Sequence, residues 1–88
     1  MIDTYQQAIE HFEKREYKSS EDILVKLKEE NENNADVLYF LAVVKSKLGN
    51  FESAIPLFEE VVKIKREHTE AYYNLALCLQ NLNRDEEA

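Results

Sequence analysis

The sequence resembles itself when it is shifted by thirty-four residues, and this self-similarity limits the possible folds more than any other feature. Alanine occupies positions 8, 42 and 76. Helices need small residues where they approach closely and large ones where they interdigitate, and both kinds recur at this interval. The repeat therefore predicts a stacked array of equal helical units rather than a bundle of unrelated helices. The same shift pairs Gln7 with Leu41 and Leu75, Tyr17 with Phe51, Ser20 with Ala54 and Ala88, Leu24 with Phe58, and Leu27 with Val61.

The hydrophobic periodicity predicts helices throughout the chain. One glycine and one proline are too few turn residues for an architecture of strands and hairpins. Apolar residues recur instead at intervals of three and four, as on one face of a helix. We predict a helix over 3–14, a second that follows the segment REYKSS, carries its apolar stripe at 23–27 and ends near 30, and further helices over 37–48, 52–65 and 70–82.

Local signals mark several helix ends. Asp3, with Gln6 three residues later, is expected to cap the first helix, and Asn34 is expected to cap the third. Gly49 is predicted to end the third helix, because glycine takes the left-handed conformation without a steric penalty. Pro56 lies just beyond the first turn of the fourth helix, where it removes one backbone hydrogen bond and is expected to bend the helix slightly.

The apolar segment VLYFLAVV at 37–44 leaves an alternative open. Its valine, tyrosine and phenylalanine residues favour a buried strand by propensity. Its length and its flanking residues fit a helix better. With eight residues it is also far shorter than the ~20 that a membrane-spanning helix needs.

The end of the chain differs from its beginning. The last residues, RDEEA, are expected to begin a sixth helix that would be too short to be stable alone. The fifth predicted helix is apolar on nearly every side, and such a helix is usually buried. The first helix, in contrast, has a polar outer side. We therefore expect an N-terminal fragment of a longer protein that self-associates through a C-terminal edge. This C-terminal edge consists of Tyr72, Leu75, Ala76, Leu79 and Leu82.

Composition excludes several classes of partner. Eighteen acidic against eleven basic residues give a net charge of −7, which repels nucleic acid and anionic lipid headgroups. At 88 residues the chain is expected to form one small domain. A single cysteine forms no internal disulfide, and no leader segment is evident at the start, so a cytoplasmic location is the default expectation.

The sequence shows no arrangement of residues typical of catalysis. His11 and His68 lack metal-ligand spacing and are interpreted as surface residues. Cys78 lies within an apolar helix, where a small buried thiol is the more common role. There is no glycine-rich phosphate loop and no serine beside a plausible base. We expect no enzyme activity, no metal and no cofactor.

The residues that fill the repeat resemble those of the tetratricopeptide repeat family, whose units are helix-turn-helix pairs of thirty-four residues. The best match is the segment at 36–64, followed by 70–88. There are departures: Arg15 and Asn83 replace the turn glycine, Asp85 replaces an aromatic residue, and Arg66 replaces a proline. In the middle unit the family positions are filled by Leu38, Leu41, Ala42, Gly49, Phe51 and Ala54. The resemblance implies an all-α fold, a right-handed superhelical array of antiparallel helix pairs over 1–88, with units at 1–34 and 35–68 and a partial unit at 69–88.

The family resemblance also implies a peptide-binding groove lined by the first helix of each unit. Tyr5, Tyr39 and Tyr73 repeat at the full period and form an apolar stripe with polar tips. Recognition of a partner and simple packing explain these tyrosines equally well. The cationic residues with which some relatives clamp acidic chaperone tails are absent, and Glu70 would repel such a ligand. The residues expected to line this groove face are Tyr5, Ile9, Phe12, Tyr39, Val43, Lys47, Tyr73, Leu77 and Asn81.

Three functions remain in competition. The leading hypothesis is a protein-interaction scaffold that binds a partner protein or peptide in its groove. The second is an accessory segment of a larger enzyme whose catalytic domain lies beyond residue 88. The third is an assembly element that joins copies of itself.

Overall fold

The computed structural model describes residues 4–87, and over this range it is a succession of helices with no strand. The helices are α1 (Thr4–Glu13), α2 (Tyr17–Glu30), α3 (Ala35–Lys47), α4 (Phe51–Ile64) and α5 (Thr69–Glu87). The predicted all-α array is confirmed. The expected cap Asp3 lies outside the described residues.

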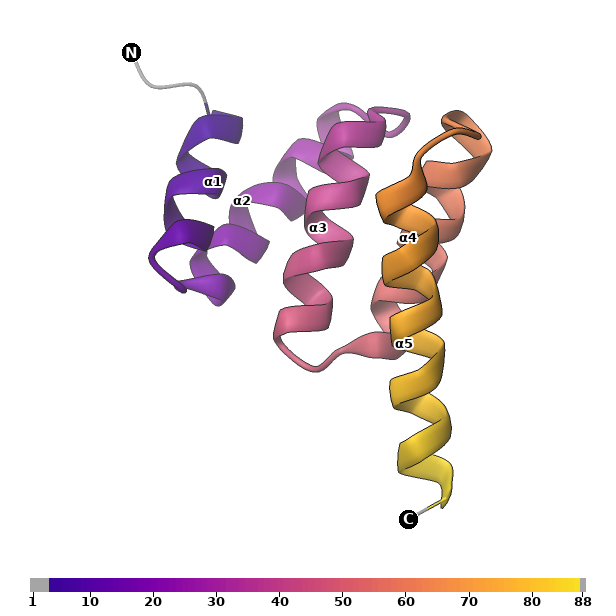
Figure 1. Ribbon diagram of the computed structural model, residues 1–88. Coiled ribbons are helices and arrows are strands. Elements are labelled where there is room, and N and C mark those ends of the chain that lie inside the picture. The colour runs from indigo at the N-terminus through magenta and orange to yellow at the C-terminus, as the bar shows by residue number, and fades with distance from the viewer. Residues whose placement is uncertain (1–3, 88) are drawn as a thin grey trace.

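The helices form two layers of antiparallel neighbours. In Figure 1, α1, α3 and α5 lie side by side, with α2 and α4 behind them. The molecule measures 47 × 28 × 20 Å along its principal axes, and the C-terminal half of α5 projects beyond the other helices. Because the first helix of each unit occupies one layer, the groove face predicted from the sequence falls on a single side of the molecule.

The turns after α1 and α3 have the same geometry, thirty-four residues apart. Gly49 has a φ of 84°, as predicted, and Arg15 takes the same left-handed conformation with a φ of 64°. The amide of Asn50 donates to the carbonyl of Lys45 at 2.9 Å, and the amide of Glu16 donates to that of His11 at 2.8 Å. Both turns therefore close the preceding helix with the bond over six residues that is typical of a left-handed C-cap.

The third turn position behaves differently and corrects the predicted sixth helix. Asn83 lies inside α5, which continues without a break to Glu87. A helical conformation at asparagine costs only several tenths of a kcal/mol relative to alanine, so nothing local forces a turn there. The segment RDEEA thus extends the fifth helix up to residue 87 instead of opening another.

The start of α2 is also earlier than the apolar stripe indicated. The helix begins at Tyr17, within the segment REYKSS that was predicted to precede it. Tyr17 packs against Phe12 with ring centroids 5.5 Å apart, and the Ser20 hydroxyl donates to the carbonyl of Ala8 at 2.8 Å. These contacts hold the first turn of α2 against α1, which outweighs the low helix propensity of its serines.

The Asn34 cap is confirmed. Its side-chain oxygen accepts hydrogen bonds from the amides of Asp36, at 3.0 Å, and Val37, at 3.3 Å. The helix that it opens contains the apolar segment 37–44, and the strand alternative is thereby excluded. Because α3 has neighbours on both sides, most of its surface faces protein, and a helix in such a position is apolar nearly all round.

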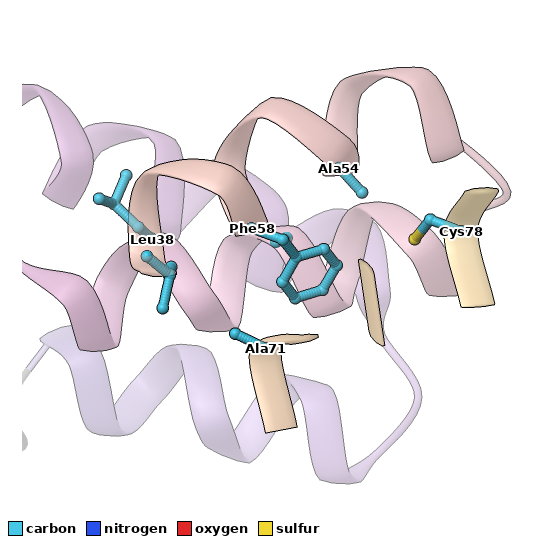
Figure 2. Close-up of a cluster of buried hydrophobic side chains, with 7 residues drawn as sticks. Leu38, Ala54, Phe58, Ala71 and Cys78 are labelled. Atoms are coloured by element: carbon cyan, nitrogen blue, oxygen red, sulfur yellow. The ribbon is translucent and has the colours of Figure 1, made fainter. Parts of the chain in front are cut away.

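Two hydrophobic clusters share α3 as their common wall. One joins α3 to α4 and α5 around Phe58, whose side chain is fully buried (Figure 2). The other joins α1, α2 and α3 around Leu24, which is the residue equivalent to Phe58 one period earlier. Close approach of each helix pair depends on small residues: Ala8 and Ser20 in the first unit, and Ala42 and Ala54 in the second, are all fully buried.

A buried carboxylate ties α2 to α3. Glu21 accepts hydrogen bonds from Lys45 of α3 at 2.7 Å and from Lys18 of its own helix at 2.8 Å. These two hydrogen bonds and the positive charges hold the pKa of Glu21 below its usual value, against the opposing effect of burial. Nothing in the repeat pattern pointed to this bridge, since neither Glu21 nor Lys45 recurs at the period.

Candidate functional site

The groove face is built from three parallel helices, and its residues differ in how much of each side chain is free. On α1, Tyr5, Ile9 and Phe12 are half-buried. On α3, Tyr39 and Val43 are half-buried and Lys47 is exposed. On α5, Tyr73 and Leu77 are exposed, with 66% and 37% of their surface free, and Asn81 is half-buried.

The first part of the groove face is largely engaged in packing. Phe40 of α3 packs edge-to-face with two rings of α1, Tyr5 at 6.0 Å and Phe12 at 5.1 Å between centroids. Both contacts have near-perpendicular planes, the arrangement that aromatic pairs prefer. Partial burial, and then the charge of Asp36, raises the pKa of Tyr5. Here the aromatic residues chiefly join one unit to the next.

The middle of the groove face is a polar and aromatic network centred on Tyr39. Its ring packs on Phe58 at 5.9 Å and on the His68 ring at 4.6 Å. Its hydroxyl donates to the Glu70 carboxylate at 3.2 Å and accepts from the Asn74 amide at 3.2 Å. Partial burial, followed by the hydrogen bond and charge of Glu70, raises the pKa of Tyr39.

The packing partner of each groove tyrosine follows one rule. Tyr5 contacts Phe40 and Tyr39 contacts Asn74, so each tyrosine meets the residue thirty-five positions later, on the first helix of the next unit. Tyr73, on α5, has no such neighbour within the described residues, and this explains its exposure. The hydroxyl-bearing stripe predicted from the period is thus present, but only its α5 end is freely accessible.

His68 differs from its predicted role as a surface residue. It is half-buried, and its Nδ1 atom accepts the amide of Ala71 at 3.2 Å. The imidazole therefore acts as the N-terminal cap of α5 while it stacks on Tyr39. The cap could have been predicted from the position of His68 directly before Thr69, the first residue of α5. A side chain that accepts hydrogen bonds is expected at that position.

The C-terminal edge is only partly open. Tyr72 and Leu79 each keep 47% of their surface free, and Ala76 is exposed. Leu75 and Leu82 are half-buried, and Leu75 packs against the cluster around Phe58. The free part of the edge is therefore a narrow strip along α5, which we call the outer face and define as Tyr72, Ala76 and Leu79.

A depression of ≈ 660 Å³ lies between α2 and α4, and no pattern in the sequence predicted it. Val25 and Leu57 flank it, Leu38 and Leu41 of α3 contribute to its wall, and Lys45 lies at its border with the Glu21 bridge. None of the residues predicted for the groove face lines it. Residues of α2, α3 and α4 all line the depression, so it lies between the two second helices and over α3.

Cys78 is the single thiol of the chain. Burial raises the pKa of the Cys78 thiol, which disfavours the reactive thiolate. In the part of the chain that the structure describes, no three His, Cys, Asp or Glu side chains are grouped so that they could hold a metal ion. Over the same residues, none of the helices combines the length and the apolar character that crossing a bilayer requires.

Comparison with known proteins finds relatives of this fold. Residues 46–88 match the family model described as tetratricopeptide repeat. The structure of the Yersinia enterocolitica type III secretion translocator chaperone SycD superposes with a TM-score of 0.88 at 14% identity, over 91% of this chain and 55% of that one. A MamA mutant superposes with a TM-score of 0.86 at 23% identity, over 96% of this chain and 61% of that one.

Residues 46–88 are thus similar to a tetratricopeptide repeat, and the thirty-four-residue period and the paired helices agree with this similarity. It is 32% identical over 78 residues to the rhomboid protease GluP of Bacillus subtilis (strain 168). That match covers 89% of this chain but 15% of the protease. The chain thus spans about half of each structural relative and a small part of the curated one.

Proposed function

We propose that this chain is a protein-interaction module that holds a segment of a partner protein against its groove face. One observation carries the proposal: Tyr73 and Leu77 are exposed on α5 beside the hydroxyl and carboxylate network of Tyr39. An exposed tyrosine beside an aliphatic side chain, next to partly exposed hydrogen-bonding groups, is a combination typical of interfaces.

The charges on the groove face define the class of ligand. Glu70 lies at the Tyr39 hydroxyl, near the start of α5, and its carboxylate disfavours an acidic side chain at that point. Lys47 is exposed at the end of α3. The ligand that fits best is a segment with a large apolar side chain for Tyr73 and Leu77 and with backbone or basic donors for Glu70.

The test uses a displayed library of random peptides selected against the 88-residue chain. We expect the selected peptides to share an apolar anchor, and Leu77→Glu to weaken their binding at least about tenfold, since it places a charge where the anchor is desolvated. Circular dichroism should be unchanged because the site is exposed. The matched control is Ala76→Glu, the same change on the outer face of α5. If Leu77→Glu leaves binding intact, the groove proposal fails.

A second function, an accessory segment of a larger enzyme, is favoured by the similarity to part of a protein named as a rhomboid protease. On this proposal the chain positions a substrate or regulator for a catalytic domain encoded elsewhere in the same reading frame. The nucleotide sequence on both sides of the codons for this chain decides the question. A reading frame that opens and closes with the 88 residues excludes it.

Self-association through the C-terminal edge stays a prediction, as does a cytoplasmic location. The exposed strip on α5 is apolar, and an isolated chain at high concentration is expected to hide it. Sedimentation equilibrium over a hundredfold range of concentration measures this directly. A mass that stays monomeric to millimolar concentration would contradict it.

A further inference from the structure

Glu70 is an exposed carboxylate at the start of the groove face on α5. It lies in the first turn of that helix. Tyr73 follows three residues later and Leu77 four residues after that, so the three side chains share one side of the helix. This stripe therefore has a negative charge at one end, and the exposed apolar side chains come directly after it.

The neighbouring helix sets the orientation of this carboxylate. The Tyr39 hydroxyl of α3 donates to the Oε2 atom of Glu70 at 3.2 Å. The side-chain amide of Asn74 donates to that hydroxyl at 3.2 Å and to the backbone carbonyl of Glu70 at 2.9 Å. Because the carboxylate is already held, less side-chain entropy is lost when a ligand binds it. Its other oxygen, Oε1, accepts no hydrogen bond from the described residues and is available to a ligand.

The charge of Glu70 has no partner within the chain as far as the structure describes it. None of the ion pairs found along residues 4–87 includes this residue. Lys65 and Arg66, in the loop before α5, are exposed and do not pair with it. The whole chain has a net charge of −7, and such a field favours the approach of a cationic segment. A positive charge on the ligand would thus meet a carboxylate that is oriented but unpaired.

We propose that the groove face selects a partner segment with a lysine or arginine close to its apolar anchor, and that Glu70 binds this cation. Because the ligand is that of the groove face, this rests on the proposed function. Glu70 lies about 4.5 Å before Tyr73 and about 10.5 Å before Leu77 along the helix axis. An extended peptide advances about 3.3 Å per residue, so the basic residue should lie about one to three positions from the anchor.

A simpler role for Glu70 is to stabilise α5 itself. An acidic residue in the first turn of a helix is favoured by the partial positive charge at that end. This role affects the stability of the helix and is indifferent to the charge of a ligand. The two roles are therefore separated by changing the charge of the ligand as well as that of the residue.

The test starts from the peptides selected by display against the 88-residue chain. Basic residues should be enriched within about three positions of the apolar anchor. For one selected peptide, glutamine in place of its basic residue and Glu70→Gln in the chain should each weaken binding about five- to tenfold at low salt, and both together no more than either alone. Isothermal titration with the four combinations measures this coupling. Glu70→Lys should bind the peptide with glutamate at the basic position at least about fivefold more tightly than the original peptide.

The matched control is Glu59→Gln, which makes the same change of net charge at an exposed position of α4. It should alter binding by less than about twofold. The proposal is overturned if the selected peptides show no enrichment of basic residues, or if Glu70→Gln and Glu59→Gln have the same effect. If Leu77→Glu abolishes binding while Glu70→Gln leaves it unchanged, the groove site stands and only the choice of a basic ligand is wrong. If Leu77→Glu leaves binding intact, both proposals fail.

Discussion

The helices α3 and α5 hold the same place in successive units, yet their surroundings differ. On α3, Leu38 and Ala42 are 1% and 0% exposed, whereas on α5 the equivalent Tyr72 is 47% exposed and the equivalent Ala76 is also exposed. Helix α3 lies between neighbours on both sides, while among the described residues α5 packs on α3 and α4 only. The repeat thus determines which residue types lie on a face of a helix. Whether those residues are buried depends on whether another helix packs against that face.

The same substitution at the two equivalent alanines should give the largest contrast. Ala42→Glu buries a carboxylate between α3 and α4 without a partner, and should destabilise the fold by ~4 kcal/mol or more. Ala76→Glu lies at an exposed helix position and should change the free energy of unfolding by less than ~0.5 kcal/mol. Urea denaturation followed by circular dichroism measures both. Equal losses would mean that α5 is covered as fully as α3.

Removal of the largest buried ring should come next. Phe58→Ala leaves a cavity where α3, α4 and α5 meet, and is expected to cost ~3–5 kcal/mol. Val62→Ala, on the half-buried side of the same helix, removes less buried surface and should cost under half of that. Thermal unfolding of the two variants side by side provides the measurement. A larger effect at Val62 would place the core elsewhere.

The bridge between the first two units should have an intermediate effect. Glu21→Gln keeps the shape of the side chain and removes the charge that holds Lys45 at 2.7 Å. Hydrogen bonds to charged groups contribute ~1.5–3 kcal/mol, and we expect a loss in this range at neutral pH. Chemical denaturation at pH 7 tests it, with Asp22→Asn, an exposed neighbour, as the matched control.

The same bridge predicts how stability depends on pH. The pKa of Glu21 is lowered by Lys18 and Lys45 in the folded state, so its contribution is complete above the unfolded pKa near 4.5. It is lost as the pH falls through the lower, folded pKa. Glu21→Gln should therefore flatten the fall in stability below pH 5. If the free energy of unfolding of this variant falls below pH 5 as steeply as that of the unaltered chain, Glu21 does not contribute to the acid dependence.

The turns should show the smallest effects, with opposite signs. Gly49→Ala places a side chain at a φ of 84°, where a Cβ would meet no atom within 4 Å, so only the backbone cost of ~1 kcal/mol is expected. Arg15→Gly relieves the same conformation at 64° and should stabilise the chain by up to ~1 kcal/mol. Denaturation midpoints measure both. Destabilisation by Arg15→Gly would show that unfolded-state entropy outweighs the strain.

The sequence predicted features that depend on local chemistry or on the period. Asn34 as a cap, Gly49 as a left-handed turn and the register of the groove tyrosines all follow from residue type and spacing. Arg15 and Asn83 both replace the turn glycine, but one takes the turn and the other stays helical. At Arg15, the packing of Tyr17 on Phe12 stabilises the turn. Near Asn83, the sequence indicates no comparable contact.

Parts of the candidate site could not be predicted because they depend on contacts between distant residues. The partners of Tyr39 come from three segments, and the stacking of His68 on its ring requires the α4–α5 loop to fold back. Phe40 looked like one of several apolar residues in α3, yet it joins α1 to α3 through two rings. The periodicity predicts which helix contains such a residue, but it does not predict which residues of other helices its side chain contacts.

Thiol labelling tests the contrast between α3 and α5 most directly. In a Cys78→Ala background, Ala42→Cys should react with a thiol reagent ~10³-fold or more slowly than an unfolded control, because a stability of ~5 kcal/mol limits access to the buried site. Ala76→Cys should react within about tenfold of that control. Equal protection at the two positions would contradict the account, since it would mean that the outer face of α5 is already covered.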